Sequence, residues 1–370
     1  MPWYIGIEIG GTKLQIAVGH GEGEPFRGFW RGAIDPTGRA GRIQDQIVRG
    51  VDELLSQARV PREQIAGVGI GFGGPVDSAG GRIVTSHQVD GWDQFPFVQW
   101  IQSTLGWPAV LHNDADTAAL AEARFGAGRG FDPVMYVTVG SGIGGGLIVG
   151  GSIFRGGGAG AMEIGHLRPG QPPLHVALPA PSVEAVASGF GIEDRARRTI
   201  AEWEEATVLV ESRFQMADGG QHVGLQSGVR QYPDRFALLM RLAGGDRKRI
   251  TTRLIAQAAA QGDRLSRDLL CDCTDTLGWA LAQAVTLINP ARIVIGGGVS
   301  LIGQEQFFEP LRRSCRGAAF KPFAALADIV PASLGEEVVV HGAVALARAA
   351  FQRESRLKAY HGDDALNTDA

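Results

Sequence analysis

The chain has 370 residues, of which 44% are hydrophobic and 20% are charged, and its formal net charge is −4. This length allows two domains with sizeable cores, and the negative charge excludes a broad basic surface for nucleic acid. No apolar run reaches the ~18 residues of a membrane span, and three cysteines are too few for a disulfide framework.

The first part of the chain predicts a β-meander, because "WYIGIEIGG", "TKLQIAVGHG" and "EPFRGFWRGA" are short apolar stretches separated by turns. Residues 39–59 then carry apolar side chains at helical spacing. "IAGVGIGF" predicts a buried strand that ends in "GGPVD". "AVLHND" predicts another strand, followed by a helix in "ADTAALAEARFGAG".

A comparable pattern begins near Val134, where "PVMYVTVGSGIGGGLIVGGSIF" predicts a second hairpin or meander. Residues 203–249 form a less regular stretch, rich in polar residues and glycine, and residues 252–290 predict two helices, the second of them buried. "ARIVIGGGVS" predicts a strand with a glycine turn, and "EEVVVHGAVALARAAFQRESR" a final helix. The repeated order predicts two similar α/β domains facing each other across a cleft.

The 54 glycines gather where the predicted strands end, and glycine there lets the backbone approach a ligand closely. "GSGIGG" at 140–145 formally fits a dinucleotide fingerprint, but it leads into a strand and not a helix, which disfavours a Rossmann site. Two hairpin turns, containing Thr12 and Ser141, remain to offer N–H and hydroxyl groups to phosphates. Ordinary tight hairpins are the alternative.

Glu8 lies inside an apolar strand, directly before the first of these turns. A carboxylate in such a strand is costly unless it has a task. Beside a phosphate turn that task is usually a hydrated Mg²⁺. We therefore expect Glu8 to hold Mg²⁺ through water.

The chain resembles ROK sugar kinases, members of the actin-like ATPase superfamily, over nearly its whole length. The resemblance rests on seven motifs in the family's order: "IGGTK", "GGPVD", "HNDADTAALAE", "VGSGIGGG", "EIGH", "EAVASG" and "INPARIVIGGGVS". It implies an α/β fold of two actin-like (ribonuclease H-like) ATPase domains flanking a cleft. We expect one domain at 1–120, completed by a C-terminal helix at about 340–358. The other spans 121–339 with an insertion at about 203–249, and 359–370 form a disordered tail.

The resemblance also implies ATP- and Mg²⁺-dependent phosphorylation of a hexose 6-hydroxyl. Glucose is the first choice of substrate, and N-acetylmannosamine, N-acetylglucosamine and fructose are rivals. The implied contacts of the ATP phosphates are Gly10, Gly11, Thr12, Lys13, Gly140, Ser141 and Gly142, and those of adenosine are Gly296, Gly297 and Gly298. The implied sugar contacts are Gly74, Asn113, Asp114, Glu163, His166 and Glu184.

Asp114 matches the family's catalytic base and lies between a predicted strand and a predicted helix. A helix N-terminus favours an ionised carboxylate, which would weaken it as a base. On sequence alone Asp114 could equally be a helix N-cap, because Asp is common at that position.

Four features depart from the family's pattern. Glu8 stands where Asp is usual, Ser141 replaces Thr, and Met162 replaces the usual Gly before Glu163. The cysteine-rich zinc loop is replaced by "LRPGQPPLHVALPAPSV", which leaves His166 and His175 as potential ligands, so we expect no zinc.

Two other function classes compete with a kinase. Some family members are sugar-responsive repressors, but the first predicted strand starts by residue 4, so no N-terminal DNA-binding domain and no nucleic-acid partner are expected. A sugar-binding protein without catalysis is the other alternative, and the presence of Asp114 disfavours it. We also expect a cytoplasmic location, because the cysteines are too few for a disulfide framework and the N-terminus lacks a secretory signal. No membrane partner is expected, and the expected oligomeric state is a homodimer.

Overall fold

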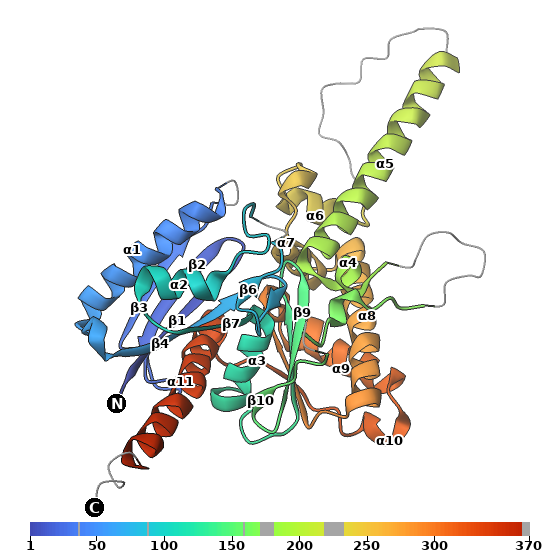
Figure 1. Ribbon diagram of the computed structural model, residues 1–370. Helices are drawn as coiled ribbons and strands as arrows, with labels where there is room; N and C mark the ends of the chain where they lie inside the picture. The colour runs from blue at the N-terminus through green and yellow to red at the C-terminus, as the bar shows by residue number, and fades with distance from the viewer. Residues whose placement is uncertain (36–37, 87–88, 158–159, 171–180, 218–232, 365–370) are drawn as a thin grey trace, which may run out of the picture.

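The computed structural model describes residues 1–35, 38–86, 89–157, 160–170, 181–217 and 233–364. Two five-stranded sheets form its centre, and Figure 1 shows them side by side with helix α3 (Asp114–Phe125) between them. None of the described helices combines the length and the apolar character needed to cross a membrane.

The first sheet has the strand order β3-β2-β1-β4-β7. β1 (Trp3–Ile9), β2 (Lys13–Gly19) and β3 (Gly28–Ala33) form an antiparallel meander, and β4 (Ile65–Phe72) and β7 (Ala109–Asn113) extend it parallel to β1. The apolar face of α1 (Ala40–Ala58) packs on β2 and β3. These elements form where the apolar periodicity predicts them.

The second sheet has the strand order β10-β9-β8-β11-β12 and repeats this plan. β8 (Val134–Val139), β9 (Ile143–Val149) and β10 (Ser152–Ile153) form an antiparallel meander, and β11 (Arg292–Gly296) and β12 (Ile329–Pro331) lie parallel to β8. The predicted repetition of the α/β pattern from Val134 onward is confirmed.

Helices of the second half cover the second sheet and carry its core. They are α4 (Val183–Ala187), α5 (Gly189–Ala217), α6 (Ala237–Leu242), α7 (Thr252–Ala260), α8 (Arg264–Ile288), α9 (Glu309–Ala318) and α10 (Lys321–Ala324). The two helices predicted over 252–290 are α7 and α8. Within α8, Cys273 is buried while Cys271 is exposed.

One local expectation needs correction, and two short elements were not predicted. The stretch 203–249 is not irregular throughout, because α5 continues to Ala217 and α6 follows; the glycine-rich part, 218–232, lies outside the described residues. Trp203 at its start packs edge-to-face on Phe236, with ring centroids 5.5 Å apart. Sequence analysis also missed α2 (Phe97–Leu105) and the short hairpin β5–β6 (Val76–Asp77 and Arg82–Ile83).

The last helix, α11 (Val338–Asp364), packs on β1 and β4 of the first sheet. It exceeds the expected span 340–358 on both sides, so residues 359–364, expected to be part of a disordered tail, are helical. The contact depends on glycine. A Cβ on Gly69 would lie 1.9 Å from the Ala343 carbonyl oxygen, and one on Gly6 2.6 Å from Val344 Cγ2.

This contact generates a stability prediction. Gly69→Ala forces α11 away from β4, and overpacking of this kind costs about 1–3 kcal/mol, so the thermal midpoint should fall. Gly41→Ala is the matched control, because Gly41 lies in α1 with nothing within 4 Å of an added Cβ. That change should stabilise the helix by about 0.5–1 kcal/mol. A Gly69→Ala variant that melts at or above the wild-type temperature would contradict the contact.

Candidate active site

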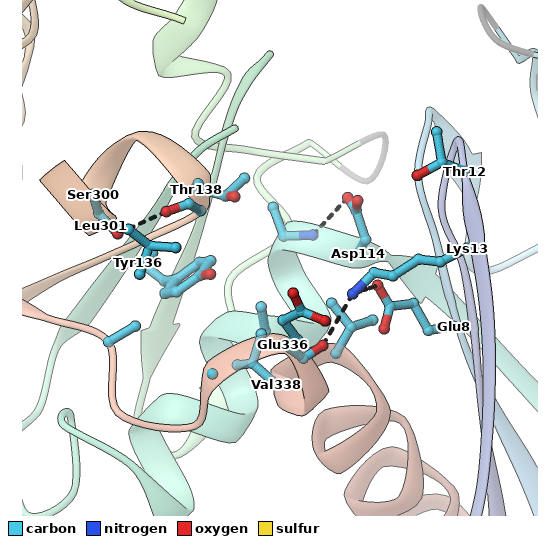
Figure 2. Close-up of a pocket in the computed structure, with 18 of the residues that line it drawn as sticks. Glu8, Thr12, Lys13, Asp114, Tyr136, Thr138, Ser300, Leu301, Glu336 and Val338 are labelled. Atoms are coloured by element: carbon cyan, nitrogen blue, oxygen red, sulfur yellow. Dashed lines mark hydrogen bonds and ion pairs between the residues drawn. The ribbon is translucent and has the colours of Figure 1, made fainter. Parts of the chain in front are cut away.

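A cavity of about 850 Å³ lies between the two sheets (Figure 2). The first sheet contributes side chains from β1, β2 and β3, the second sheet contributes β8 and β11, and α3 and α11 form the floor. The lining residues are Glu8, Thr12, Lys13, Arg31, Gly32, Ala33, Asp114, Ala115, Ala118, Tyr136, Thr138, Gly296, Gly297, Gly298, Ser300, Leu301, Ala332, Gly335, Glu336, Val338 and Val339.

Strands β1 and β2, on either side of the first glycine turn, supply an ion pair to this cavity. Lys13 Nζ lies 3.0 Å from Glu8 Oε1 and donates a hydrogen bond of 3.0 Å to the Glu336 carbonyl oxygen. Glu8 is 4% exposed. Burial raises the pKa of Glu8 to about 7, and Lys13 opposes that shift. The pair therefore places a cation and a titratable carboxylate beside the predicted phosphate turn.

Asp114 is the first residue of α3, and Figure 2 shows it between the Lys13 side and the Tyr136 side of the cavity. Its Oδ1 accepts a hydrogen bond of 2.8 Å from the Ala115 N–H. Desolvation nevertheless raises the pKa of Asp114 to about 6, outweighing the backbone hydrogen bonds and the Lys13 charge. The expectation that the helix terminus leaves Asp114 a weak base is wrong, because burial dominates.

Asn113, and not Asp114, is the N-cap of α3. Its side-chain oxygen accepts from the Ala115 and Asp116 N–H groups, and its Nδ2 donates to the Gly74 carbonyl oxygen at 3.0 Å. The alternative of Asp114 as a helix N-cap is therefore wrong. Because Asn113 satisfies the helix end, the carboxylate of Asp114 is available to the cavity.

The far wall follows β11, where the chain turns into the short helix Gly298–Ile302. A Cβ on Gly296 would lie 2.3 Å from the Tyr136 hydroxyl oxygen. Gly297 has a φ of +85°, and its Cβ would lie 2.5 Å from the Val139 backbone. Close approach thus explains two of the three glycines predicted to contact adenosine, and all three line the cavity.

The second glycine turn lies against Glu184. The Glu184 Oε2 accepts a hydrogen bond of 2.8 Å from the Ile143 N–H, and a Cβ on Gly142 would lie 2.7 Å from it. The Gly140 carbonyl accepts from the Gly189 N–H at 2.7 Å. In this structure Glu184 is therefore a support for the turn of Gly140, Ser141 and Gly142.

Glu163 precedes a short helical turn, Ile164–His166, and His166 ends it, with 4.0 Å between Glu163 Oε2 and His166 Nε2. Both side chains are more than 70% exposed. Met162 before them has a φ of +67°, a conformation that favours glycine, and its side chain packs against the second core. Glycine would adopt this backbone conformation without strain, whereas Met162 adopts it at an energetic cost.

The structure brings only part of the predicted set to the cavity wall: Glu8, Thr12, Lys13, Asp114 and Gly296–Gly298. Gly10 and Gly11 form the adjacent turn. Gly74, Asn113, Gly140, Ser141, Gly142, Glu163, His166 and Glu184 are not among its described lining residues. Their roles, like those of the lining residues, stay predictions. Ser300, the last residue of the segment "GGGVS" that the resemblance places near adenosine, also lines the cavity. The sequence did not predict the lining residues Arg31, Tyr136, Thr138, Leu301 and Glu336.

The residues around Glu8 fit a hydrated Mg²⁺. Magnesium in phosphoryl-transfer sites is usually held by one or two carboxylates, waters and substrate phosphates. Glu8 offers one carboxylate that already receives the ammonium of Lys13, so its Oε1 faces a cation. Within the described residues there is no group of three His, Cys, Asp or Glu that could hold a metal. His175 lies outside them, and the absence of zinc stays a prediction.

Comparison with known proteins identifies the family. A model of the ROK family matches residues 4–350. The chain belongs to the ROK family. The predicted family and its fold of two actin-like α/β domains are therefore confirmed.

Individual ROK proteins are similar over nearly the full length. The glucokinase of Streptomyces coelicolor is 30% identical over 351 residues, which are 93% of this chain and 97% of that protein. The crystal structure of a ROK family glucokinase from Streptomyces griseus, in complex with glucose and AMPPNP, has a TM-score of 0.71 at 30% identity and covers 94% of this chain and 99% of that one. A ROK family transcriptional regulator has the same TM-score at 21% identity, covering 94% of this chain and 78% of the regulator, and shows the fold alone.

The raised pKa of Asp114 generates a prediction about unfolding. Between pH about 4 and 6, the native carboxyl holds its proton while the unfolded one, with an ordinary pKa of 3.8, has lost it. The native state then binds more protons, so stability falls as pH rises through this window. The unfolding free energy of wild type minus that of Asp114→Asn should decrease from pH 4 to 6 and then level off. Urea titrations at several pH values measure this difference, and a difference that grows with pH would contradict the raised pKa of Asp114.

Proposed function

We propose that the protein is an ATP- and Mg²⁺-dependent hexose kinase that phosphorylates the 6-hydroxyl of glucose. The observation that carries this proposal is the position of Asp114. It faces the cavity that also contains the Glu8–Lys13 pair and the glycine wall of β11. Similarity to glucokinases over more than 90% of the chain supports the same reaction.

Asp114 is the proposed general base. Phosphoryl transfer needs a residue that accepts the proton of the attacking hydroxyl and holds that hydroxyl in position. A base is most effective when its pKa lies near the working pH, and burial brings the pKa of Asp114 to about 6. The oxygen of the sugar hydroxyl forms a bond to the γ-phosphorus, and the bond between that phosphorus and the oxygen bridging the β- and γ-phosphates breaks, so that ADP leaves. Asp114 takes the proton of the hydroxyl.

The proposed contacts of the ATP phosphates and of the metal lie on one side of the cavity and include Thr12, Lys13 and Glu8. When bound, Mg²⁺ neutralises the charge on the transferred phosphoryl group. Lys13 would donate to the phosphate oxygens, and Glu8 is the residue that would hold Mg²⁺ through water. The backbone of Gly296–Gly298, with Ser300 and Leu301 beyond it, receives the adenosine at the opposite wall.

The sugar-contacting residues of the proposal are Asn113, Glu163 and His166, together with Gly74 and Glu184. Asn113 donates to the Gly74 carbonyl directly beside Asp114. Glu163 lies close enough to Asp114 to raise its pKa. N-acetylmannosamine, N-acetylglucosamine and fructose remain rival substrates of the same reaction.

A cytoplasmic location and a homodimer belong to the same proposal. The three cysteines are free thiols, and exposed Cys271 suits a reducing compartment. Light scattering after gel filtration tests the homodimer.

A coupled assay with ATP, Mg²⁺ and a panel of glucose, N-acetylmannosamine, N-acetylglucosamine and fructose tests the reaction and its substrate. We expect the highest kcat/KM for glucose. Calorimetric binding of a sugar with no turnover of any of the four would instead favour a sugar-binding protein without catalysis.

Asp114→Asn should lower kcat by about two orders of magnitude or more, since a positioned base contributes about 10²–10⁴-fold. The acid limb of the wild-type profile near pH 6 should disappear from the residual activity, while glucose affinity falls only modestly because an amide still accepts one hydrogen bond. Asp52→Asn is the control, because Asp52 pairs with Arg62 at the surface of α1. Turnover of the Asp114→Asn variant within a few-fold of wild type would contradict the assignment of Asp114 as the general base.

Glu8→Gln should raise the Mg²⁺ concentration needed for half-maximal turnover and leave glucose affinity nearly unchanged. The amide keeps the shape of the side chain but loses the charge that faces the cation. Turnover titrated with Mg²⁺ at saturating ATP measures the first effect, and calorimetry with glucose measures the second. An unchanged Mg²⁺ dependence would remove Glu8 from the metal site.

A further inference from the structure

Gln15 is a buried polar residue in the middle of β2. Its side chain is 1% exposed, and its strand neighbours from Leu14 to Val18 are otherwise apolar and buried. In the antiparallel pair β1–β2, Gln15 stands directly opposite Glu8. A buried amide needs hydrogen-bond partners, so its contacts indicate what it is held against.

Gln15 completes a closed set of contacts around the Glu8 carboxylate. With its amide nitrogen turned toward the available acceptors, Gln15 donates to Glu8 Oε2 and, at 3.1 Å, to the Glu336 carbonyl oxygen. Lys13 Nζ contacts the other carboxylate oxygen, Oε1, and the same Glu336 carbonyl, each at 3.0 Å. Each oxygen of Glu8 therefore has its own donor, and one carbonyl receives both donors.

The carbonyl of Glu336, which accepts from both Gln15 and Lys13, lies in the segment that connects the two sheets. Glu336 belongs to the short turn Gly335–Glu337, between β12 of the second sheet and α11, which packs on the first sheet. The contacts of Gln15 and Lys13 thus connect the carboxylate in β1 to the segment that crosses between the two sheets. The side chain of Arg31 adds an ion pair to the Glu336 side chain from β3.

The two donors differ in what they do when a nucleotide arrives. Lys13 carries a charge and faces the cavity, so phosphate oxygens compete with Glu8 for it. Gln15 is neutral and buried behind Glu8, so nothing in the cavity competes for its amide. Once Lys13 turns to phosphate, Gln15 still holds Oε2, and Oε1 is left directed at the position that the ammonium occupied.

We propose that Gln15 is a positioning residue for Mg²⁺. It fixes the rotamer of Glu8, so that Oε1 faces the hydrated cation while Oε2 stays bound to the amide. This inference rests on the proposed function, because it assigns Gln15 to the metal side of that site. Residues that orient a metal-binding group typically change metal affinity or activity by about 10–100-fold when they are replaced.

The test compares nucleotide affinity with and without the metal. A non-hydrolysable ATP analogue is titrated by calorimetry into wild type, Gln15→Leu and Gln15→Met, in EDTA and in excess Mg²⁺. We expect Mg²⁺ to tighten binding to wild type and this gain to fall about tenfold in both variants. Affinity for the metal-free analogue and for glucose should stay within about two-fold. Gln15→Met keeps an unbranched side chain of similar length and serves as the second variant if the Gln15→Leu protein does not fold.

Two controls separate positioning from general loss of stability. Gln283→Leu removes an amide that donates to the Trp279 carbonyl within α8; neither residue is among the described lining residues, so this change should leave the Mg²⁺ gain intact. In a Glu8→Gln background, adding Gln15→Leu should reduce the Mg²⁺ gain no further, because Gln15 acts through Glu8.

Three results would overturn the inference. The gain from Mg²⁺ could be unchanged in the Gln15 variants, the variants could lose metal-free nucleotide and glucose affinity equally, or the two substitutions could act additively. Each of these leaves the proposed kinase reaction standing. If Mg²⁺ does not change the nucleotide affinity of the wild type, that result would instead overturn the metal site itself, together with the role of Gln15.

Discussion

Helix α11 and strand β4 lie so close together that no side chain fits between them at Gly69, where a Cβ would be 1.9 Å from the Ala343 carbonyl. The other side of the helix is equally close to α3, because a Cβ on Gly342 would be 2.0 Å from the Thr117 carbonyl. The first sheet, α3 and α11 therefore form one tightly packed unit. Asp114 at the start of α3 and Glu336 just before α11 gain fixed positions relative to Glu8 from this packing.

This fixed geometry brings several carboxyl groups into surroundings where burial favours their neutral forms. Burial raises the pKa values of Glu8 and Asp116 to about 7 and that of Asp114 to about 6. Lys13 is a nearby cation that opposes the shifts of Glu8 and Asp114. Arg31 is the other cation among the described lining residues, and it already pairs with the Glu336 side chain. In the proposed function these two positive charges do not balance Glu8 together with an incoming triphosphate, so Mg²⁺ supplies the remaining positive charge. The carboxylate that Lys13 would leave is the one assigned to Mg²⁺.

The sequence predicts the parts of this site that depend on local pattern. The strands, the glycine turns and the polar Glu8 in an apolar strand are all visible within windows of about ten residues. Gln15, like Glu8, is a polar residue within an apolar strand, and that pattern could have identified it. The helical spacing of Phe97, Ile101 and Leu105, followed by Gly106, could have predicted α2. The contact of Arg31 with Glu336 could not be predicted from the sequence, because it joins residues 305 positions apart. The pKa of Asp114 was equally out of reach, since desolvation depends on everything packed around the residue.

The two halves of the site are built from different kinds of structure, and this difference bears on specificity. The nucleotide and metal side stands on strands and helix ends, whose backbone groups are held by sheet and helix hydrogen bonds. The predicted sugar side includes Glu163 and His166, which lie at the start and the end of a single helical turn and expose most of their side chains. That turn is anchored by Met162, whose positive φ costs conformational energy and whose side chain packs against the second core. Apolar packing thus holds a backbone shape that glycine would adopt without strain, and it also restricts the turn more than glycine would. In the proposed kinase, the direction in which Glu163 meets the sugar is therefore set by the packing of Met162, one residue outside the predicted contacts.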